Sequence, residues 1–285
     1  MSLSTRGRAS LVVLTAAAAV VAIAGPAAAL TSTVEPTTAS APAAVKPTIV
    51  LVHGAWADGS SFAAVTEKLQ KDNYTVLNAP EPLRGLATDA ASVAAFVNQA
   101  TTGPVVLVGH SYGGSVITNA ALQAPQVKAL AYIDAFAPDL GESVVDLAGA
   151  RPGSVLAAAP ETLFNFVQDP NMPTGDADLY VKNSVFAAGF TAGLSKSEAA
   201  VLAATQRPVA GGALQEPSAA PAWKTIPSFF LIGTKDKVIP VAEQEAMAAR
   251  AGGVSVKVSA GHLSMIEKPK DVARLIEQAA DSIKK

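Results

Sequence analysis

The chain has 285 residues, half of them apolar, and a formal charge of −2 from 21 basic and 23 acidic side chains. That length suits one domain of roughly 200–250 residues with additional segments, and the balanced charge argues against a nucleic-acid partner. The absence of cysteine excludes disulfides, thiolate metal sites and a thiol nucleophile.

The first 29 residues have the pattern of an export signal. Two arginines precede the apolar stretch 11–25, and the small residues 27–29 are of the kind that signal peptidase accepts, so we expect cleavage after Ala29. An uncleaved membrane anchor is the alternative, and Pro26 favours cleavage. An exported chain without disulfides indicates a secreted or periplasmic bacterial protein, with no stable membrane association after cleavage.

Residues 30–46 are rich in Thr, Ala and Pro and show no apolar periodicity. This composition is typical of a flexible linker. We therefore expect the folded domain to span residues 47–285.

From residue 47 the chain alternates short apolar runs with longer helical patterns. The apolar runs predict strands at 48–54, 74–80, 104–110, 127–136, 227–234 and 254–262. The helical patterns lie at 60–71, 88–100, 114–124, 240–251 and 268–283. This alternation predicts a doubly wound α/β fold, with a mostly parallel six-stranded sheet flanked by helices. The runs are continuously apolar, which is typical of strands covered on both faces.

Residues 139–226 interrupt this alternation. The segment is helical in places, rich in Pro and Gly, and we expect it to form a helical cap over the carboxyl edge of the sheet. Its phenylalanine and tyrosine side chains either line an apolar substrate pocket or bury the cap against the sheet. They are Phe164, Phe166, Tyr180, Phe186 and Phe190.

The segment VVLVGHSYGG (105–114) ends an apolar run with a serine between glycines. Gly109, Ser111 and Gly113 match the pattern G-x-S-x-G, in which a strand turns sharply into a helix. The central residue takes a strained backbone conformation with positive φ, and side chains at the flanking glycines would collide. Its hydroxyl projects at the amino end of the helix, where negative charge is favoured. We predict that Ser111 is a nucleophile.

A serine nucleophile needs a base that takes its proton, and the chain has three histidines. His110 is adjacent to Ser111, so we expect its side chain to point away from the hydroxyl, into the core. His53 follows the first predicted strand and is expected to be structural, forming hydrogen bonds within its loop. His262 ends the last predicted strand, where a loop can bring it over the serine. By elimination, we predict His262 as the base.

The base in turn needs a carboxylate that sets its tautomer. Asp236 follows the fifth predicted strand, and the order Ser111, Asp236, His262 accompanies this serine motif. Asp134 and Asp139, which follow the preceding strand, are the alternatives. We predict Asp236.

Acyl chemistry also needs hydrogen-bond donors for the oxyanion. The backbone N–H of Tyr112, directly after the nucleophile, is one predicted donor. The N–H of Ala55 is the other, because Gly54 in that loop leaves room for the substrate oxygen. One such donor is worth ~10²–10³ in rate.

Four segments, HGAW, GHSYGG, GTKDKVIP and AGHLSMIEKP, occur in this order and resemble the α/β-hydrolase superfamily. The resemblance spans roughly residues 47–284. The short start and the spacing resemble its esterase and hydroxynitrile-lyase-like branch, which includes small bacterial serine hydrolases, plant methylesterases and pyrethroid-type esterases. The resemblance implies a serine hydrolase that acts on esters, with a helical cap and no cofactor.

Two departures from relatives narrow this resemblance. Hydroxynitrile lyases of the branch carry a lysine immediately after the catalytic histidine, where this chain has Leu263, so cyanohydrin cleavage is disfavoured. A haloalkane dehalogenase needs an aspartate as nucleophile, and Ser111 at that position excludes this activity.

We therefore predict a secreted serine hydrolase that cleaves carboxylic esters, lactones included, of small apolar substrates through an acyl-enzyme, without metal or cofactor. Two alternatives stay open. One is a cofactor-free perhydrolase of the haloperoxidase type, which uses peroxide in place of water. The other is a non-catalytic protein that binds a small molecule on the same fold, although binding alone needs no aligned base.

Overall fold

The structure is a computed structural model that describes residues 46–283. The predicted signal peptide (1–29) and residues 30–45 of the predicted linker lie outside the described residues, as do the last two residues of the predicted domain. No helix in the described part of the chain has the length and apolar character needed to span a bilayer.

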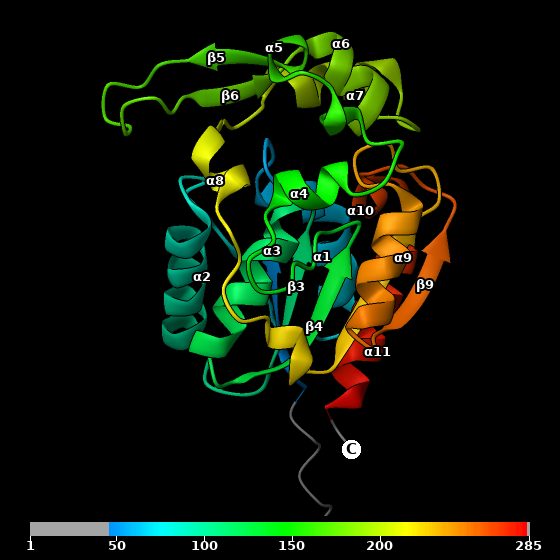
Figure 1. The fold of residues 1–285 in the computed structure, drawn as a ribbon. Coiled ribbons are helices and arrows are strands. Elements are labelled where there is room, and N and C mark those ends of the chain that lie inside the picture. Colours follow the sequence, from blue (N-terminus) through cyan, green and yellow to red (C-terminus); the bar gives the residue numbers. More distant parts are fainter. Residues whose placement is uncertain (1–45, 284–285) are drawn as a thin grey trace, which may run out of the picture. The chain divides into compact units, whose positions relative to one another are not determined.

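Six strands form one sheet in the order β2-β1-β3-β4-β8-β9 (Figure 1). All neighbouring pairs are parallel. The strands are β1 (Thr48–Val52), β2 (Val76–Ala79), β3 (Val105–His110), β4 (Val127–Ile133), β8 (Ser228–Gly233) and β9 (Val254–Val258). The predicted doubly wound α/β fold with six strands is confirmed.

Helices cover both faces of the sheet, and the alternating side chains of the strands pack against them. Val50 and Val52 of β1 belong to a core cluster that includes residues of α2 (Leu86–Ala100), α3 (Tyr112–Ala120) and α9 (Val241–Arg250). Ile49 and Leu51 belong to a second cluster with α1 (Ala63–Lys71), α10 (Ser264–Glu267) and α11 (Pro269–Ser282). Each fully buried aliphatic side chain contributes about 1.5–3 kcal/mol through removal of apolar surface from water.

Two details of the strands differ from the sequence prediction. β9 is not covered on both faces: it lies at the sheet edge, and its residues are exposed or only partly buried. An edge strand has one neighbour and needs less apolar surface, which agrees with its alternating Val-Ser-Val-Lys-Val pattern. β4 stops at Ile133, short of the predicted 127–136, because Asp134 turns the backbone with a φ of 42°.

The insertion between β4 and β8 contains short helices and a second sheet. Its helices are α4 (Val144–Gly149), α5 (Pro160–Leu163), α6 (Asn183–Val185), a π-helical turn (Phe186–Phe190), α7 (Lys196–Ala204) and α8 (Gly211–Gln215). Three antiparallel strands, β5 (Phe164–Val167), β6 (Asp178–Val181) and β7 (Val209–Ala210), form the small sheet. The sequence had indicated helices alone, because these strands are only two to four residues long and show no clear strand pattern.

The helices α5 to α7 and the β5–β6 pair lie over the end of the six-stranded sheet at which β3 and β4 finish (Figure 1). Specific hydrogen bonds join the two parts: Trp56 Nε1 donates to the Leu179 carbonyl at 2.8 Å, and the Ala210 N–H donates to the Leu83 carbonyl at 2.9 Å. Arg84 also forms an ion pair with Asp178 of β6. The insertion is therefore fastened to the loops that follow β1 and β2.

Candidate active site

Ser111 is the single residue between β3 and α3, and its backbone has a conformation that few residues adopt. Its φ is 51° and its ψ is −122°, a strained combination for a residue with a side chain. The turn is tight enough that a Cβ on Gly109 would lie 2.5 Å from the Gly113 carbonyl oxygen, and a Cβ on Gly113 would lie 2.3 Å from the His53 carbonyl oxygen. The two glycines of the motif are thus required by close backbone approach.

The structure brings the side chains of Ser111, His262 and Asp236 into one hydrogen-bonded row. His262 Nε2 lies 2.9 Å from Ser111 Oγ, and His262 Nδ1 lies 2.9 Å from Asp236 Oδ2. All three residues are buried. A carboxylate only accepts hydrogen bonds, so the proton of a neutral His262 lies on Nδ1 and the lone pair of Nε2 faces the serine hydroxyl.

Three hydrogen-bond donors besides His262 hold the Asp236 carboxylate. Its Oδ1 accepts from the backbone N–H groups of Val238 (2.7 Å) and Ile239 (3.0 Å), and its Oδ2 accepts from Gln244 Nε2 at 2.9 Å. Gln244 was not identified from the sequence, because a glutamine inside the amphipathic helix α9 carries no pattern of its own. These bonds fix the carboxylate that faces His262.

The two alternative acids lie elsewhere. The Asp134 carboxylate accepts the N–H of Gly233 at 2.7 Å and that of Ser264 at 3.2 Å, so it ties the end of β8 to the segment after His262. Burial, together with the nearby charge of Asp236, raises the pKa of Asp134 well above its usual range. Asp139 forms an ion pair with Lys224 at the surface, 2.7 Å apart.

The two predicted oxyanion donors are both free. Among residues 46–283, neither the Ala55 N–H nor the Tyr112 N–H has a hydrogen-bond acceptor. The loop that carries Ala55 lies directly against the nucleophile, since a Cβ on Gly54 would lie 2.9 Å from Ser111 Cβ. Two unpaired backbone donors therefore lie in the immediate neighbourhood of the serine.

The other two histidines are also buried. His53 Nδ1 lies 2.9 Å from the Gly54 carbonyl oxygen, in agreement with the expectation of a loop hydrogen bond, and burial lowers its pKa to about 4. His110 is buried as expected, but its ring also lies beside that of His262, with centroids 4.8 Å apart. Its Nε2 donates to the His262 carbonyl at 2.9 Å. Burial, and then the neighbouring His262, lower the pKa of His110 well below its usual range.

Buried acids beneath the loop were not identified from the sequence. Tyr112 donates its hydroxyl to Asp89 at 2.8 Å, which joins the start of α3 to α2, and burial raises the pKa of Asp89. Glu81 is fully buried, and neither of its carboxyl oxygens has a hydrogen-bond partner. Burial and the nearby Asp89 raise the pKa of Glu81 well above its usual range. No group of three or more His, Asp or Glu side chains in the described chain is placed to hold a metal ion.

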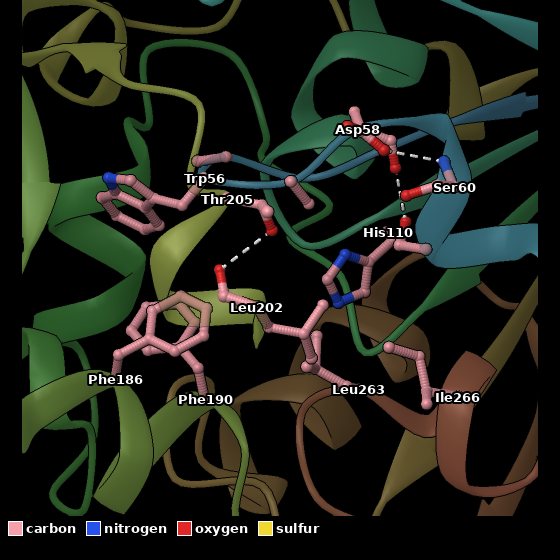
Figure 2. Close-up of a pocket in the computed structure, with 13 residues that line it drawn as sticks. Trp56, Asp58, Ser60, His110, Phe186, Phe190, Leu202, Thr205, Leu263 and Ile266 are labelled. Carbon is pink, nitrogen blue, oxygen red and sulfur yellow. Dashed lines mark hydrogen bonds between the residues drawn. The ribbon is translucent and has the colours of Figure 1, made fainter. Parts of the chain in front are cut away.

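A cavity of about 40 Å³ lies between the insertion and the sheet, next to this row (Figure 2). Figure 2 shows Trp56, Phe186 and Phe190 grouped on one side of it and His110 on another. Ser111 and His262 do not line the cavity themselves. Phe190, which does line it, packs edge-on against the His262 ring, with ring centroids 5.6 Å apart. Ala55 and Leu263, the neighbours of the loop glycine and of His262, also line it.

Three of the five phenylalanine and tyrosine side chains of the insertion take one of the two expected roles. Phe186 and Phe190 line the cavity. Phe164 is buried and stacks on Trp56, with ring centroids 5.6 Å apart. Phe166 is 49% exposed and Tyr180 is partly buried, so neither faces this cavity.

Residues 49–275 match the alpha/beta hydrolase family. The chain belongs to this family. The resemblance seen in the four sequence segments is thereby confirmed, and the protein is a hydrolase by family.

Characterised relatives of this alpha/beta hydrolase include esterases. A carbendazim hydrolyzing esterase of Nocardioides sp. is 36% identical over 110 residues, 34% of this chain and 46% of the relative, so the match spans less than half of that protein. An alpha/beta hydrolase of Aspergillus novofumigatus is 26% identical over 83% of this chain and 97% of its own. A solved pyrethroid hydrolase from Sphingobium faniae JZ-2 has a TM-score of 0.65 at 21% identity, over 83% of this chain and 98% of that one.

Proposed function

We propose that this alpha/beta hydrolase is a serine esterase that cleaves carboxylic esters through an acyl-enzyme. The observation that carries the proposal is the continuous row from Ser111 Oγ through the His262 ring to Asp236, with 2.9 Å at each step. A histidine that is oriented by a carboxylate and faces a serine hydroxyl is the arrangement that activates a serine nucleophile.

In the first half of the reaction, Ser111 Oγ attacks the ester carbonyl while His262 Nε2 takes the hydroxyl proton. The imidazolium that forms is stabilised by Asp236. The carbonyl oxygen becomes an oxyanion, which accepts hydrogen bonds from the Ala55 and Tyr112 N–H groups. His262 then gives its proton to the leaving alcohol, and the acyl group remains on Ser111.

In the second half, a water molecule replaces the alcohol. His262 takes a proton from this water, the resulting hydroxide attacks the acyl carbonyl, and the same two N–H groups hold the second oxyanion. Collapse of that intermediate releases the carboxylic acid and returns the proton to Ser111. The free donors are important in both halves, because preorganised N–H groups are worth ~10²–10³ in rate each.

The cavity lining and the names of the relatives support the proposed substrate class. Trp56, Phe186, Phe190, Leu263 and Ile266 give the cavity an apolar wall, which favours small esters and lactones with apolar acyl or alcohol parts. The names of the relatives, a carbendazim hydrolyzing esterase and a pyrethroid hydrolase, point to small-molecule substrates as well.

A volume of about 40 Å³ is enough for one or two water molecules and too small for an ester. We therefore expect the side chains of the insertion to move aside when the substrate enters. The hydrogen bond from Trp56 to Leu179 and the packing of Phe190 on His262 are the contacts that such a movement has to change.

The test uses the full chain and its Ser111→Ala variant with p-nitrophenyl acetate and butyrate. The wild type should hydrolyse both esters and bind a fluorophosphonate label covalently, and the variant should do neither. A wild-type chain that hydrolyses no short ester and takes no label would overturn the proposal in favour of a non-catalytic binding protein. Halogenation or peracid formation in the presence of peroxide would indicate additional perhydrolase activity of the same serine.

We also propose that the protein is exported, with its signal peptide removed after Ala29. The charged start, the apolar stretch and the small residues before the cleavage point support this. Expression in a bacterium followed by mass spectrometry of the intact protein tests it, since the secreted form should begin at Leu30. A cell-associated chain that keeps residues 1–29 would indicate the membrane anchor instead.

A further inference from the structure

An arginine of the insertion, Arg207, contacts the loop after β1, which carries the proposed oxyanion donor Ala55. Arg207 lies between α7 and β7 and is partly buried. Its Nη1 is 3.2 Å from His53 Nε2, and its Nη2 donates to the Glu81 carbonyl at 3.3 Å. The insertion and the loop after β1 therefore meet at His53.

The chemistry of the partners fixes the tautomer of His53. A guanidinium only donates hydrogen bonds, so the Nε2 atom that faces Arg207 carries a lone pair. The Nδ1 atom faces the Gly54 carbonyl oxygen at 2.9 Å, which only accepts, so Nδ1 carries the proton. A protonated His53 would place an N–H against the guanidinium. Burial and the positive charge of Arg207 agree with a neutral ring, because both lower the pKa of His53.

The carbonyl that accepts from His53 belongs to the same peptide unit as the proposed oxyanion donor. The Gly54 C=O and the Ala55 N–H share one plane, so a hydrogen bond that holds the oxygen also fixes the direction of the N–H. It polarises the peptide as well, which strengthens the N–H as a donor. The same oxygen accepts a longer bond, 3.4 Å, from the Ala57 N–H.

We propose that Arg207 is a positioning residue that acts through His53 to orient and polarise the Gly54–Ala55 peptide, so that the insertion helps to build the oxyanion hole. This inference rests on the proposed serine esterase function. The chain of groups runs from the Arg207 guanidinium to His53 Nε2, from His53 Nδ1–H to the Gly54 carbonyl, and from the Ala55 N–H to the substrate oxygen. Arg207 and His53 do not touch the substrate.

Two acids also face this group. The Glu81 carboxyl lies 3.6 Å from His53 Nδ1 and competes with Gly54 for the proton most strongly when it is ionised. Burial and Asp89 raise the pKa of Glu81, which weakens this competition, and the Gly54 carbonyl oxygen is also nearer to Nδ1, at 2.9 Å. Asp58 interacts with both His53 and Arg207 through its charge.

The kinetic test compares Arg207→Met with Arg84→Met in the full chain. Arg84 is the matched control because its ion pair with Asp178 also ties the insertion to the loop after β2, without contact to His53. With p-nitrophenyl butyrate, Arg207→Met should lower kcat about 10-fold with KM within about twofold, less than the ~10²–10³ for loss of a whole donor. Its affinity for phenylboronic acid, which forms a tetrahedral adduct with the serine, should fall by a similar factor. Arg84→Met should change KM or Tm and leave kcat unchanged.

A spectroscopic test reads the tautomer directly. The chain has three histidines, so long-range ¹H–¹⁵N spectra of the ¹⁵N-histidine protein contain few signals. Wild-type His53 should be in the Nδ1–H form, and in Arg207→Met it should shift toward a mixture. In His53→Asn, the side-chain amide can replace the Nδ1–H donor, so this variant should retain more kcat than His53→Leu.

The outcomes separate this inference from the function on which it rests. An active wild type with unchanged kcat in Arg207→Met, or equal kcat losses in Arg207→Met and Arg84→Met, overturns the inference alone. A wild-type His53 in the Nε2–H form overturns it as well. An inactive wild type overturns the serine esterase function and this inference together.

Discussion

The carboxylate that contacts the His262 ring belongs to Asp236, whose Oδ2 lies 2.9 Å from Nδ1. Asp134 instead accepts the N–H groups of Gly233 and Ser264. Both acids follow strands at the same edge of the sheet, so their sequence positions alone did not separate them. The choice between them has a direct kinetic consequence.

Asp236→Asn should lower kcat by about 10⁴, because the amide leaves the imidazole in the wrong tautomer to accept the serine proton. Asp134→Asn should keep kcat within about tenfold and instead destabilise the fold by about 1–3 kcal/mol, through a mismatched buried hydrogen bond. Steady-state kinetics and urea unfolding of both variants measure this. A crippled Asp134→Asn beside a mildly affected Asp236→Asn would reverse the assignment.

The lowered pKa of His53 makes stability depend on pH. The ring is neutral in the folded chain down to about pH 4, whereas an unfolded histidine binds a proton below about pH 6.5. The unfolded state therefore binds more protons in this window, and the contribution of His53 is present above pH 6.5 and is lost as the pH falls toward 4. The loss amounts to roughly 3 kcal/mol.

The measurement is the free energy of unfolding of the wild type and of His53→Asn between pH 4 and 8. The variant lacks the contribution of His53. The difference in free energy of unfolding between wild type and variant should therefore shrink on acidification and stay constant above pH 7. His110 and the buried acids are present in both proteins and cancel in the comparison. Parallel pH curves would contradict the neutral, buried state of His53.

Gly113→Ala should be strongly destabilising. The added Cβ would lie 2.3 Å from the His53 carbonyl oxygen and 2.8 Å from that of Val52, and these backbone atoms cannot move without disturbing β1. We expect a loss of about 3 kcal/mol or more and little activity. Gly149→Ala at the end of α4 is the control, because its Cβ would meet no atom within 4 Å, and it should stabilise the protein by about 0.5–1 kcal/mol. Equal Tm values for the two variants would contradict the tight packing of the turn.

Phe186→Ala should widen the substrate range. Phe186 is buried and lines the cavity, so its removal creates space at a cost of about 3–5 kcal/mol in stability. The ratio of kcat/KM for p-nitrophenyl octanoate to that for the acetate should rise by about 10-fold. Phe166→Ala, at an exposed position of the insertion, should leave this ratio unchanged. An unchanged ratio in Phe186→Ala would show that the acyl chain binds elsewhere.

Much of the fold follows from patterns that are local in the sequence. The six apolar runs predicted the six strands, because buried parallel strands need uninterrupted apolar residues; only the edge strand β9 alternates instead. The predicted ends were less accurate, as at Asp134, where a turn is set by the loop that follows and not by the apolar character of the run. The small sheet of β5 to β7 was missed because its strands are only two to four residues long, too short for a recognisable apolar period.

For the candidate site, the sequence predicted a nucleophile, a base and several candidate acids, and the structure shows which of these side chains contact one another. Ser111, Asp236 and His262 were selected from their places after strands, and their side chains lie in one row; their parts in the reaction stay a prediction. Gln244 and Arg207 had no signal in the sequence. Each is placed by a contact outside its own helix or strand: Gln244 with Asp236, eight residues away, and Arg207 with His53, 154 residues away.

The amino-acid sequence by itself determined the order of strands and helices and the strained serine turn, since these depend on side-chain size, apolar periodicity and glycine within a few neighbouring residues. Only the tertiary structure decided which aspartate faces the imidazole and which arginine reaches His53. Those contacts join segments 26 and 154 residues apart, and their geometry depends on how the whole sheet and its insertion pack together.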